Sequence, residues 1–355
     1  TESLDNSNQG AIRSNQTLHI NASGSLNNRS GQLSSVGQLS IDDGARQTLA
    51  VDNTGGSILA GGDARIQSRS LSNNGTVAAG RDLDIALQDS FTVEQDIVAA
   101  RRLTLSTQGN LNNPHTLQGG EAVTLQAAQI DNHASGKIQS GGRTEITAVH
   151  NIGNRGLINS NGSTVLRAGE VIDNLGSGKI FGDHVALGSS VLNNREETVN
   201  GATQAAVVAA RQRLDIGAKE IDNREGGLLS SEGSLAIGGA LDAQNQAAGM
   251  AETLMNSSAR IEAKGNGVIA VKQLQNRNNH FTVEEYLAEQ RSMDQYSAPG
   301  DPRKWTQGEN GYFRKNRKSL EFRFQDFNKE FWHDSLAGTR QWHFTRSVYK
   351  ERITD

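Results

Sequence analysis

The stretch VTLQAAQIDNHASGKIQSGG (residues 123–142) decides the fold. It begins as a short strand in which Val123 and Leu125 alternate with polar residues, so both apolar side chains face one side. An apolar residue and a polar pair ending in Asn132 come next. A turn rich in small residues then leads to Ile138 and a closing Gly-Gly. This order of segments predicts one coil built from short strands and tight turns.

The same pattern recurs through the first 280 residues at a spacing near 20. Its apolar marker falls at Leu33, Ile58, Val77, Ile97, Leu117, Ile138, Ile158, Ile180 and Leu228. The last gap, of 48 residues, is expected to hold two units and an insert over residues 195–212. A period sustained this long predicts a solenoid instead of a globular domain. We expect an all-β chain with a β-helix of about 12 coils of ~20 residues each over residues 1–280.

Asparagine recurs where each coil turns. Asparagine and glycine tolerate the positive φ angles of tight turns, and stacked carboxamides can hydrogen-bond to one another. The predicted turn ladder consists of Asn28, Asn74, Asn113, Asn132, Asn174, Asn194 and Asn223.

Composition excludes several classes of protein. The net charge of −4 and the pI of about 6.1 disfavour a strongly basic nucleic-acid binder. The absence of cysteine rules out disulfides and thiolate metal sites. No run of about 18 apolar residues exists, so no membrane-spanning helix is expected. The polar start, TESLDNSNQG, lacks the apolar region of a signal peptide, so we expect either an intracellular chain or an internal piece of something longer.

The coil pattern resembles the filamentous haemagglutinin family, the β-helical exoproteins of two-partner secretion. The matching text is LxIxAxxLxNxxGxIxSxGxL, as in residues 123–142. LQNRNNHFTVEE (274–285) and WHFTRSVYKERITD (342–355) are similar to the segment by which such proteins interrupt and resume their coils. The resemblance implies a right-handed parallel β-helix secreted through an outer-membrane transporter to the surface of a Gram-negative bacterium. It further implies contact with a target-cell receptor, in adhesion or in toxin delivery during contact-dependent growth inhibition.

Residues 281–355 form a second, aromatic-rich region. They hold 14 of the 16 aromatic residues, whereas residues 1–280 hold Phe91 and Phe181. Thr282-Val-Glu-Glu285 fits a capping box and predicts a short helix over residues 286–296. Alternation in 319–327 and 341–349 predicts two strands of a hairpin or small sheet. This extension is expected to pack on the rod or to cap it.

The extension also carries the candidate partner-binding residues. These are the basic run and its aromatic neighbours, with two tryptophans: Tyr312, Phe313, Arg314, Lys315, Arg317, Lys318, Trp332 and Trp342. They could contact an acidic receptor or glycan. The simpler interpretation, a solvated loop beside aromatics that form the extension's own core, is favoured because charge runs usually face water.

An enzyme is the alternative to a structural and adhesive protein. Some parallel β-helices cleave polysaccharides, and Asp42-Asp43, Asp82 with Asp84, and Asp183 are candidate paired carboxylates. Asp84 and Asp215 occupy an outward strand position that other coils fill with unrelated polar residues, which indicates a solvent-exposed slot. The eight histidines form no zinc-binding spacing, and no phosphate-binding motif occurs. We therefore expect no catalytic site, cofactor or metal.

Overall fold

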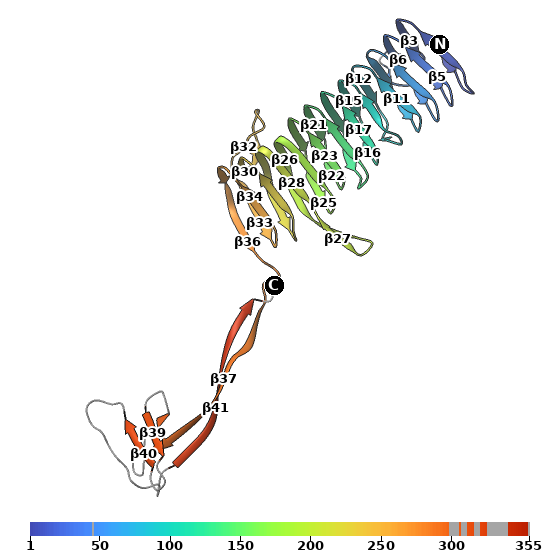
Figure 1. Ribbon diagram of the computed structural model, residues 1–355. Coiled ribbons are helices and arrows are strands. Elements are labelled where there is room, and N and C mark those ends of the chain that lie inside the picture. Colours follow the sequence, from blue (N-terminus) through green and yellow to red (C-terminus); the bar gives the residue numbers. More distant parts are fainter. Residues whose placement is uncertain (45, 298–304, 307–310, 316–319, 325–339, 354–355) are drawn as a thin grey trace. The chain divides into compact units, whose positions relative to one another are not determined.

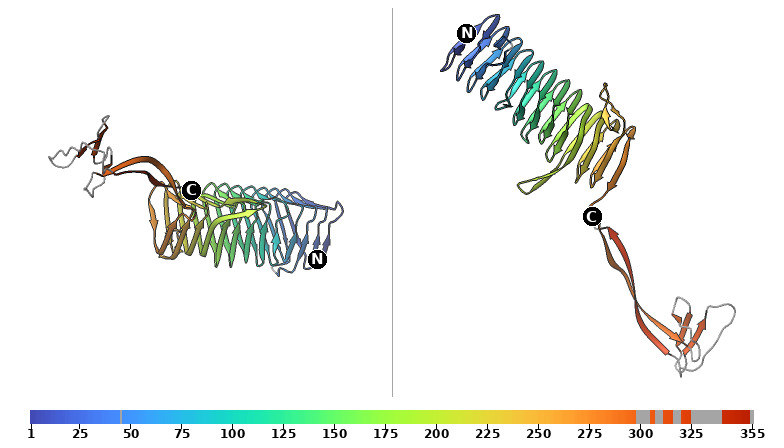
Figure 2. Two further views of the ribbon diagram at one scale, coloured as in Figure 1. Left: turned by 90° about the horizontal axis from the view of Figure 1, so that it is seen from below. Right: turned by 180° about the vertical axis from the view of Figure 1, so that it is seen from behind.

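The computed structural model describes residues 1–44, 46–297, 305–306, 311–315, 320–324 and 340–353 (Figure 1). The chain divides into two units, Thr1–Asn279 and His280–Asp355. The first unit is a parallel β-helix of about 13 turns with a spacing of ~21 residues (Figures 1 and 2). The expected fold class is therefore confirmed, with about one coil more than the sequence indicated.

Three rows of parallel strands run along this rod, and strands pair with their counterparts one coil away, except that the second row is not paired between β10 and β13. The first row consists of β3 (Thr17–Asn21), β6 (Gln38–Asp42), β9 (Ala64–Ser68), β12 (Leu83–Leu87), β15 (Arg102–Thr107), β18 (Ala122–Ala127), β21 (Arg143–Ala148), β24 (Ser163–Ala168), β30 (Ser234–Gly238) and β35 (Gly267–Ile269). The second consists of β1 (Ser3–Asp5), β4 (Ser25–Asn27), β7 (Ala50–Asp52), β10 (Ser70–Ser72), β13 (Phe91–Thr92), β16 (Asn110–Asn113), β19 (Gln129–Asn132), β22 (Asn151–Asn154), β25 (Val171–Leu175), β33 (Ala251–Ser257) and β36 (Val271–Arg277). The third consists of β2 (Ala11–Ser14), β5 (Gln32–Ser35), β8 (Ser57–Ala60), β11 (Thr76–Ala79), β14 (Ile97–Ala99), β17 (Thr116–Gly119), β20 (Lys137–Ser140), β23 (Leu157–Ser160), β29 (Leu228–Ser231) and β34 (Arg260–Ala263). The long strands β26 (Lys179–Val199) and β28 (Val207–Arg224) pass through all three rows.

Aliphatic side chains fill the interior in stacked rows. The register pairs Ile138 with Ile158 and Leu125 with Ile146, and all four are completely buried. Burying one such side chain contributes about 1.5–3 kcal/mol, so each coil is held by its neighbours without a large globular core. Phe91 is the one aromatic side chain buried among residues 1–279.

Two insertions interrupt the regular coils. In the first, β26 continues into an antiparallel hairpin with β27 (Ala202–Ala205), and Asn200 and Gly201 turn with positive φ angles of 51° and 79°. Such angles suit a two-residue hairpin turn. The hairpin lies inside the predicted insert at 195–212.

The second insertion comprises residues 239–250 and was not predicted. Leu214 pairs with Leu235, 21 residues on, whereas Ile221 pairs with Leu254, which is twelve residues further than a regular coil requires. The extra residues include the small hairpin of β31 (Ala240–Leu241) and β32 (Ala247–Ala248). We call residues 239–250 the clasp.

The second unit corrects two local expectations. The helix predicted over 286–296 is wrong, because β37 (Val283–Ser297) pairs along its length with β41 (Arg340–Ile353). This pairing supplies hydrogen-bond partners to the backbone N–H and C=O groups that would otherwise bond within a helix. The tertiary pairing therefore overrides the local capping-box signal. The described residues contain no helix.

The predicted hairpin partners are also wrong. β40 (Leu320–Phe324) pairs with β39 (Gly311–Lys315), and β38 (Trp305–Thr306) pairs with β37. Only four residues separate β39 from β40, so closing that loop costs less entropy than pairing β40 with the more distant β41. Packing of this unit on the rod stays a prediction.

Candidate functional site

A row of buried asparagines runs beside the second row of strands. Within each series the Nδ2 of one asparagine donates to the Oδ1 of the asparagine in the next coil, over 2.7–2.8 Å, and only the last residue, Asn276, is exposed. One series is Asn6, Asn28, Asn53 and Asn73, and the other is Asn113, Asn132, Asn154, Asn174, Asn194, Asn223, Asn256 and Asn276. The structure thus places six of the seven predicted ladder residues in this row, which we call the asparagine ladder.

Asn74 is the seventh, and its assignment to the ladder is wrong. Asn73 occupies the rung, whereas Asn74 is exposed and accepts a 2.8 Å hydrogen bond from the Gly55 amide. Two consecutive asparagines left the choice open, and the alternation of the strand decides it, since only Asn73 falls on the inward side with Leu71. The prediction also missed the rungs at Asn6, Asn53, Asn154, Asn256 and Asn276, although each occupies the corresponding place in its coil.

The ladder is interrupted at one coil. Val93 takes the rung between Asn73 and Asn113, and its side chain is completely buried. Asn73 Nδ2 and Asn113 Oδ1 are consequently buried without a hydrogen-bond partner. A buried polar atom left unpaired costs about 1–3 kcal/mol, so this coil is a local weak point of the rod.

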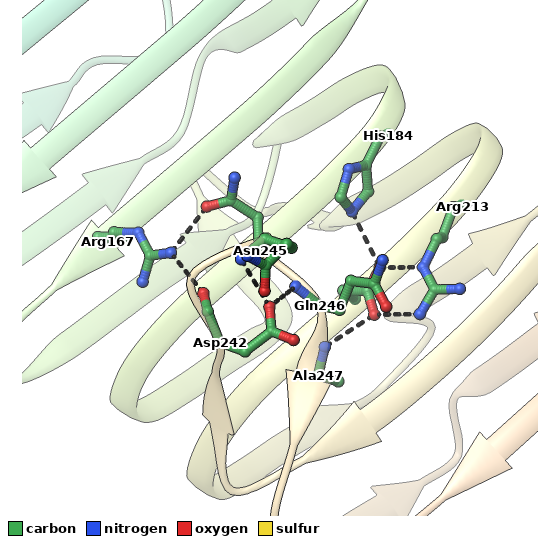
Figure 3. Close-up of polar contacts among 9 residues, drawn as sticks. Arg167, His184, Arg213, Asp242, Asn245, Gln246 and Ala247 are labelled. Carbon is green, nitrogen blue, oxygen red and sulfur yellow. Dashed lines mark hydrogen bonds and ion pairs between the residues drawn. The ribbon is translucent and has the colours of Figure 1, made fainter.

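A second polar cluster lies beneath the clasp (Figure 3). Asp215, on β28, has a completely buried side chain. Arg213 Nε and Nη2 donate to it over 2.5 and 2.9 Å, His184 Nε2 lies 2.9 Å from its Oδ2, and the Ala247 amide of the clasp donates over 2.8 Å. The sequence placed this residue in a solvent-exposed slot, which is wrong because the unpredicted clasp covers it.

These contacts set the charge of the carboxylate. Burial raises the pKa of Asp215, but the hydrogen bonds from His184, Arg213 and the Ala247 amide outweigh burial and lower the pKa to about 2. Asp215 is therefore ionised at any physiological pH. With every oxygen partnered, the carboxylate fastens the clasp and offers no free base for catalysis.

The rod surface beneath the clasp is made of small residues. Val165 and Ala186, which stand outward on their strands, are nearly or completely buried. A Cβ added to Gly188 would lie 3.0 Å from Leu241 Cδ1, and one added to Gly217 would collide with the backbone at Ala240. These glycines leave the space that the clasp occupies.

One further contact reaches an earlier coil. Arg167, on β24, donates through Nη2 to the Asp242 carbonyl over 3.2 Å and to Asn245 Oδ1 over 2.7 Å (Figure 3). The clasp therefore spans the coils of β24, β26, β28 and β30. Its position could not be read from the sequence, because no repeat unit contains it.

Four of the five carboxylates considered for catalysis have structural partners. Asp43 is buried and accepts the amides of Gln47, Thr48 and Leu49, which closes the loop between β6 and β7. Asp42 accepts from Asn21, Asp84 pairs with Arg65 over 3.6 Å, and Asp183 pairs with Arg211 over 2.5 Å. Asp82 is the exception, because its Oδ1 is buried without a hydrogen-bond partner. Among the described residues no group of three or more histidine or acidic side chains could hold a metal ion.

The candidate partner-binding residues are only partly described. Tyr312, Phe313, Arg314 and Lys315 lie on β39, and Trp342 lies on β41 opposite Gln295. Arg317, Lys318 and Trp332 lie outside the described residues. Their binding role stays a prediction.

The repeating coils, the aliphatic rows and the asparagine ladder define residues 1–279 as a structural repeat protein of the parallel β-helix class. The chain belongs to the haemagglutinin repeat family, whose model matches residues 1–56, 35–113, 95–174, 148–202 and 185–288. That family forms repeat filaments and is not an enzymatic domain. No solved structure matches the chain. Where the chain is described, no helix is long and apolar enough to cross a bilayer.

Three curated relatives are much longer proteins, and the chain matches only a small part of each. The chain is similar to the deoxyribonuclease CdiA of Dickeya dadantii, with 28% identity over 301 residues, which is 78% of this chain and 8% of the relative. It is 30% identical over 185 residues to the toxin CdiA of Escherichia coli, covering 46% of this chain and 6% of that protein. The tRNA nuclease CdiA of Yersinia mollaretii is 27% identical over 137 residues, 33% and 5% respectively. The chain thus spans less than a tenth of each of these relatives.

Proposed function

We propose that this chain is a segment of a secreted, cell-surface filament of a Gram-negative bacterium, and that it serves as the stalk of a contact-dependent growth inhibition toxin. The observation that carries the proposal is a rod held by aliphatic rows and an asparagine ladder, in which the buried asparagines and the buried Asp215 are engaged in structural contacts. The relatives are named as toxins and nucleases. In this proposal the rod holds such a toxin away from the producing cell.

The implied partners follow from the same proposal. An outer-membrane transporter of the two-partner pathway would export the chain, and each coil could fold on the preceding one as it emerges. Parallel pairing of successive coils supports this, because each new strand needs only the previous coil as its template.

We assign contact with the target cell to residues 280–355. Several described apolar side chains of the β37–β41 ribbon are exposed, including Val283, Leu287, Tyr349 and Ile353. Exposed apolar side chains gathered on a two-stranded ribbon are typical of an interaction surface.

A polysaccharide-cleaving role has no support. Of the two aromatics of the rod, Phe91 is buried and Phe181 is half-buried, so no aromatic platform for sugar stacking lies on the described rod.

The test uses the full chain and intact target cells. The double variant Tyr349→Ser/Ile353→Ser removes two exposed apolar side chains from the ribbon. Val36→Ser/Val149→Ser removes two equally exposed side chains from the rod and is the matched control. We expect cell binding to fall with the first variant and to persist with the second. Equal binding by both would remove the ribbon as the contact surface, and binding lost only with the rod variant would assign contact to the rod.

A further inference from the structure

We propose that the clasp, residues 239–250, is a one-way latch that closes over coils formed earlier in the chain and keeps them from unwinding from their C-terminal side. In a regular solenoid each coil contacts only its neighbours, so opening at one end can pass from coil to coil. The clasp is different because it ties four successive coils together.

The span of the clasp is set by contacts far apart in sequence. Arg167 reaches Asn245 across 78 residues and the Asp242 carbonyl across 75. Between these ends, Leu241 lies over Gly188 of β26, and the Ala247 amide donates to Asp215 of β28. Unwinding the coil of β28 or of β26 therefore requires the clasp to lift first.

The surface under the clasp exists only after coils have stacked. The histidine and the arginine that partner Asp215 stand opposite each other in register, His184 on β26 and Arg213 on β28. The clasp follows all of these residues in the chain, so it can dock only on coils that have already formed. The clasp can thus close only after the coils of β26 and β28 have stacked correctly, and this order of events makes the latch one-way.

The buried carboxylate of Asp215 disfavours states in which the clasp is only partly lifted. Lifting the clasp takes the Ala247 amide from Asp215 and the Asn245 side chain from Arg167. A buried ion deprived of one partner is costly, so a partly lifted clasp is disfavoured relative to the closed or fully open state. The apolar contact of Leu241 with the glycine-lined surface adds to the closed state.

Hydrogen exchange measured on the full chain tests the latch. The variant Leu241→Ala/Asn245→Ala weakens the clasp without altering any residue of the coils beneath it. Val199→Ala/Thr203→Ala, at the tip of the β26–β27 hairpin, is the matched control in the other insertion. Deleting residues 239–250 restores the regular 21-residue spacing and provides a second, stronger variant.

We expect amides of β24, β26 and β28 to exchange at least tenfold faster in the clasp variant. Amides of β3 to β12, which lie far along the rod, and of β34 and β36, which stack beyond the clasp, should keep their rates. Faster exchange confined to residues 239–250 would overturn the proposal, and so would a uniform acceleration along the whole rod. If the deletion variant fails to fold, the double substitution decides the question.

Discussion

Replacing Val93 by asparagine would join the two halves of the asparagine ladder. The new carboxamide would accept from Asn73 Nδ2 and donate to Asn113 Oδ1, the two buried atoms that lack partners. An asparagine should fit at this position, because the next coil carries Asn113 at the same rung. The turns that follow Val93 and Asn113 have the same length and both lack glycine, and His115 stands where Gln95 stands in the coil of Val93.

The expected gain follows from two opposing contributions. Two hydrogen bonds that relieve buried, unpaired atoms contribute together about 2–4 kcal/mol. Removing the completely buried Val93 side chain costs about 1.5–2.5 kcal/mol in lost apolar burial. The balance favours Val93→Asn over the native chain by about 1 kcal/mol. Val93→Ala loses the burial without gaining the hydrogen bonds, so the asparagine variant should exceed it by about 3 kcal/mol.

Amide exchange of β13 and β16 is the suitable assay, because a repeat rod need not unfold in a single step. Protection factors of these strands should rise in Val93→Asn and fall in Val93→Ala. The reverse substitution Asn154→Val creates a new interruption and should lower the protection of β19 and β25. If Val93→Asn is no more protected than Val93→Ala, the reasoning that the ladder stabilises the rod is refuted.

Three further outcomes are expected. Burial raises the pKa of Asp43, but the amides it accepts lower it to about 2, below the ordinary 3.8, so its contribution to stability is complete above pH 3.8 and is lost as the pH falls towards 2. An acid-unfolding series of Asp43→Asn should accordingly show a smaller change in stability between pH 4 and 2 than the native chain. Gly120→Ala should destabilise the rod by about 3 kcal/mol in denaturant, because the new Cβ collides with a carbonyl of the preceding coil, whereas Gly201→Ala, with φ of 79° and no atom near its Cβ, should cost only about 1 kcal/mol. Glu285 and Glu351 stand directly opposite each other on β37 and β41, so Glu285→Lys should raise amide protection of that ribbon at low salt, and unchanged protection would mean that the pair does not repel.

The sequence predicted the rod because its signal is repeated many times. The spacing of markers such as Ile138, Ile158 and Ile180 corresponds to the observed register, since each residue stacks on its counterpart one coil away. A single coil would have been ambiguous. The error at Asn74 shows the limit of the pattern, because a pair of identical residues conceals which one faces inward.

The clasp and the second unit lack such repetition. The contact between Arg167 and Asn245 joins residues 78 positions apart, and nothing in either local sequence signals it. The segment 286–296 has helix-favouring composition and a capping signal, yet its state is decided by pairing with a strand about 60 residues later. Long-range pairing of this kind is invisible to local propensity.

The asparagine ladder also gives the rod a polarity. Wherever two asparagines meet, the amide nitrogen points to the following coil, and in most rungs the same nitrogen also donates to a strand carbonyl there, as Asn28 does to Ser57 and Asn174 to Val207, which fixes its orientation. The side-chain dipoles therefore align head to tail along the axis and add together. If the carboxamide of one coil pointed the other way along the axis, two amide nitrogens would face each other at one junction and two amide oxygens at the other. A chain of this design therefore accepts new coils in only one orientation.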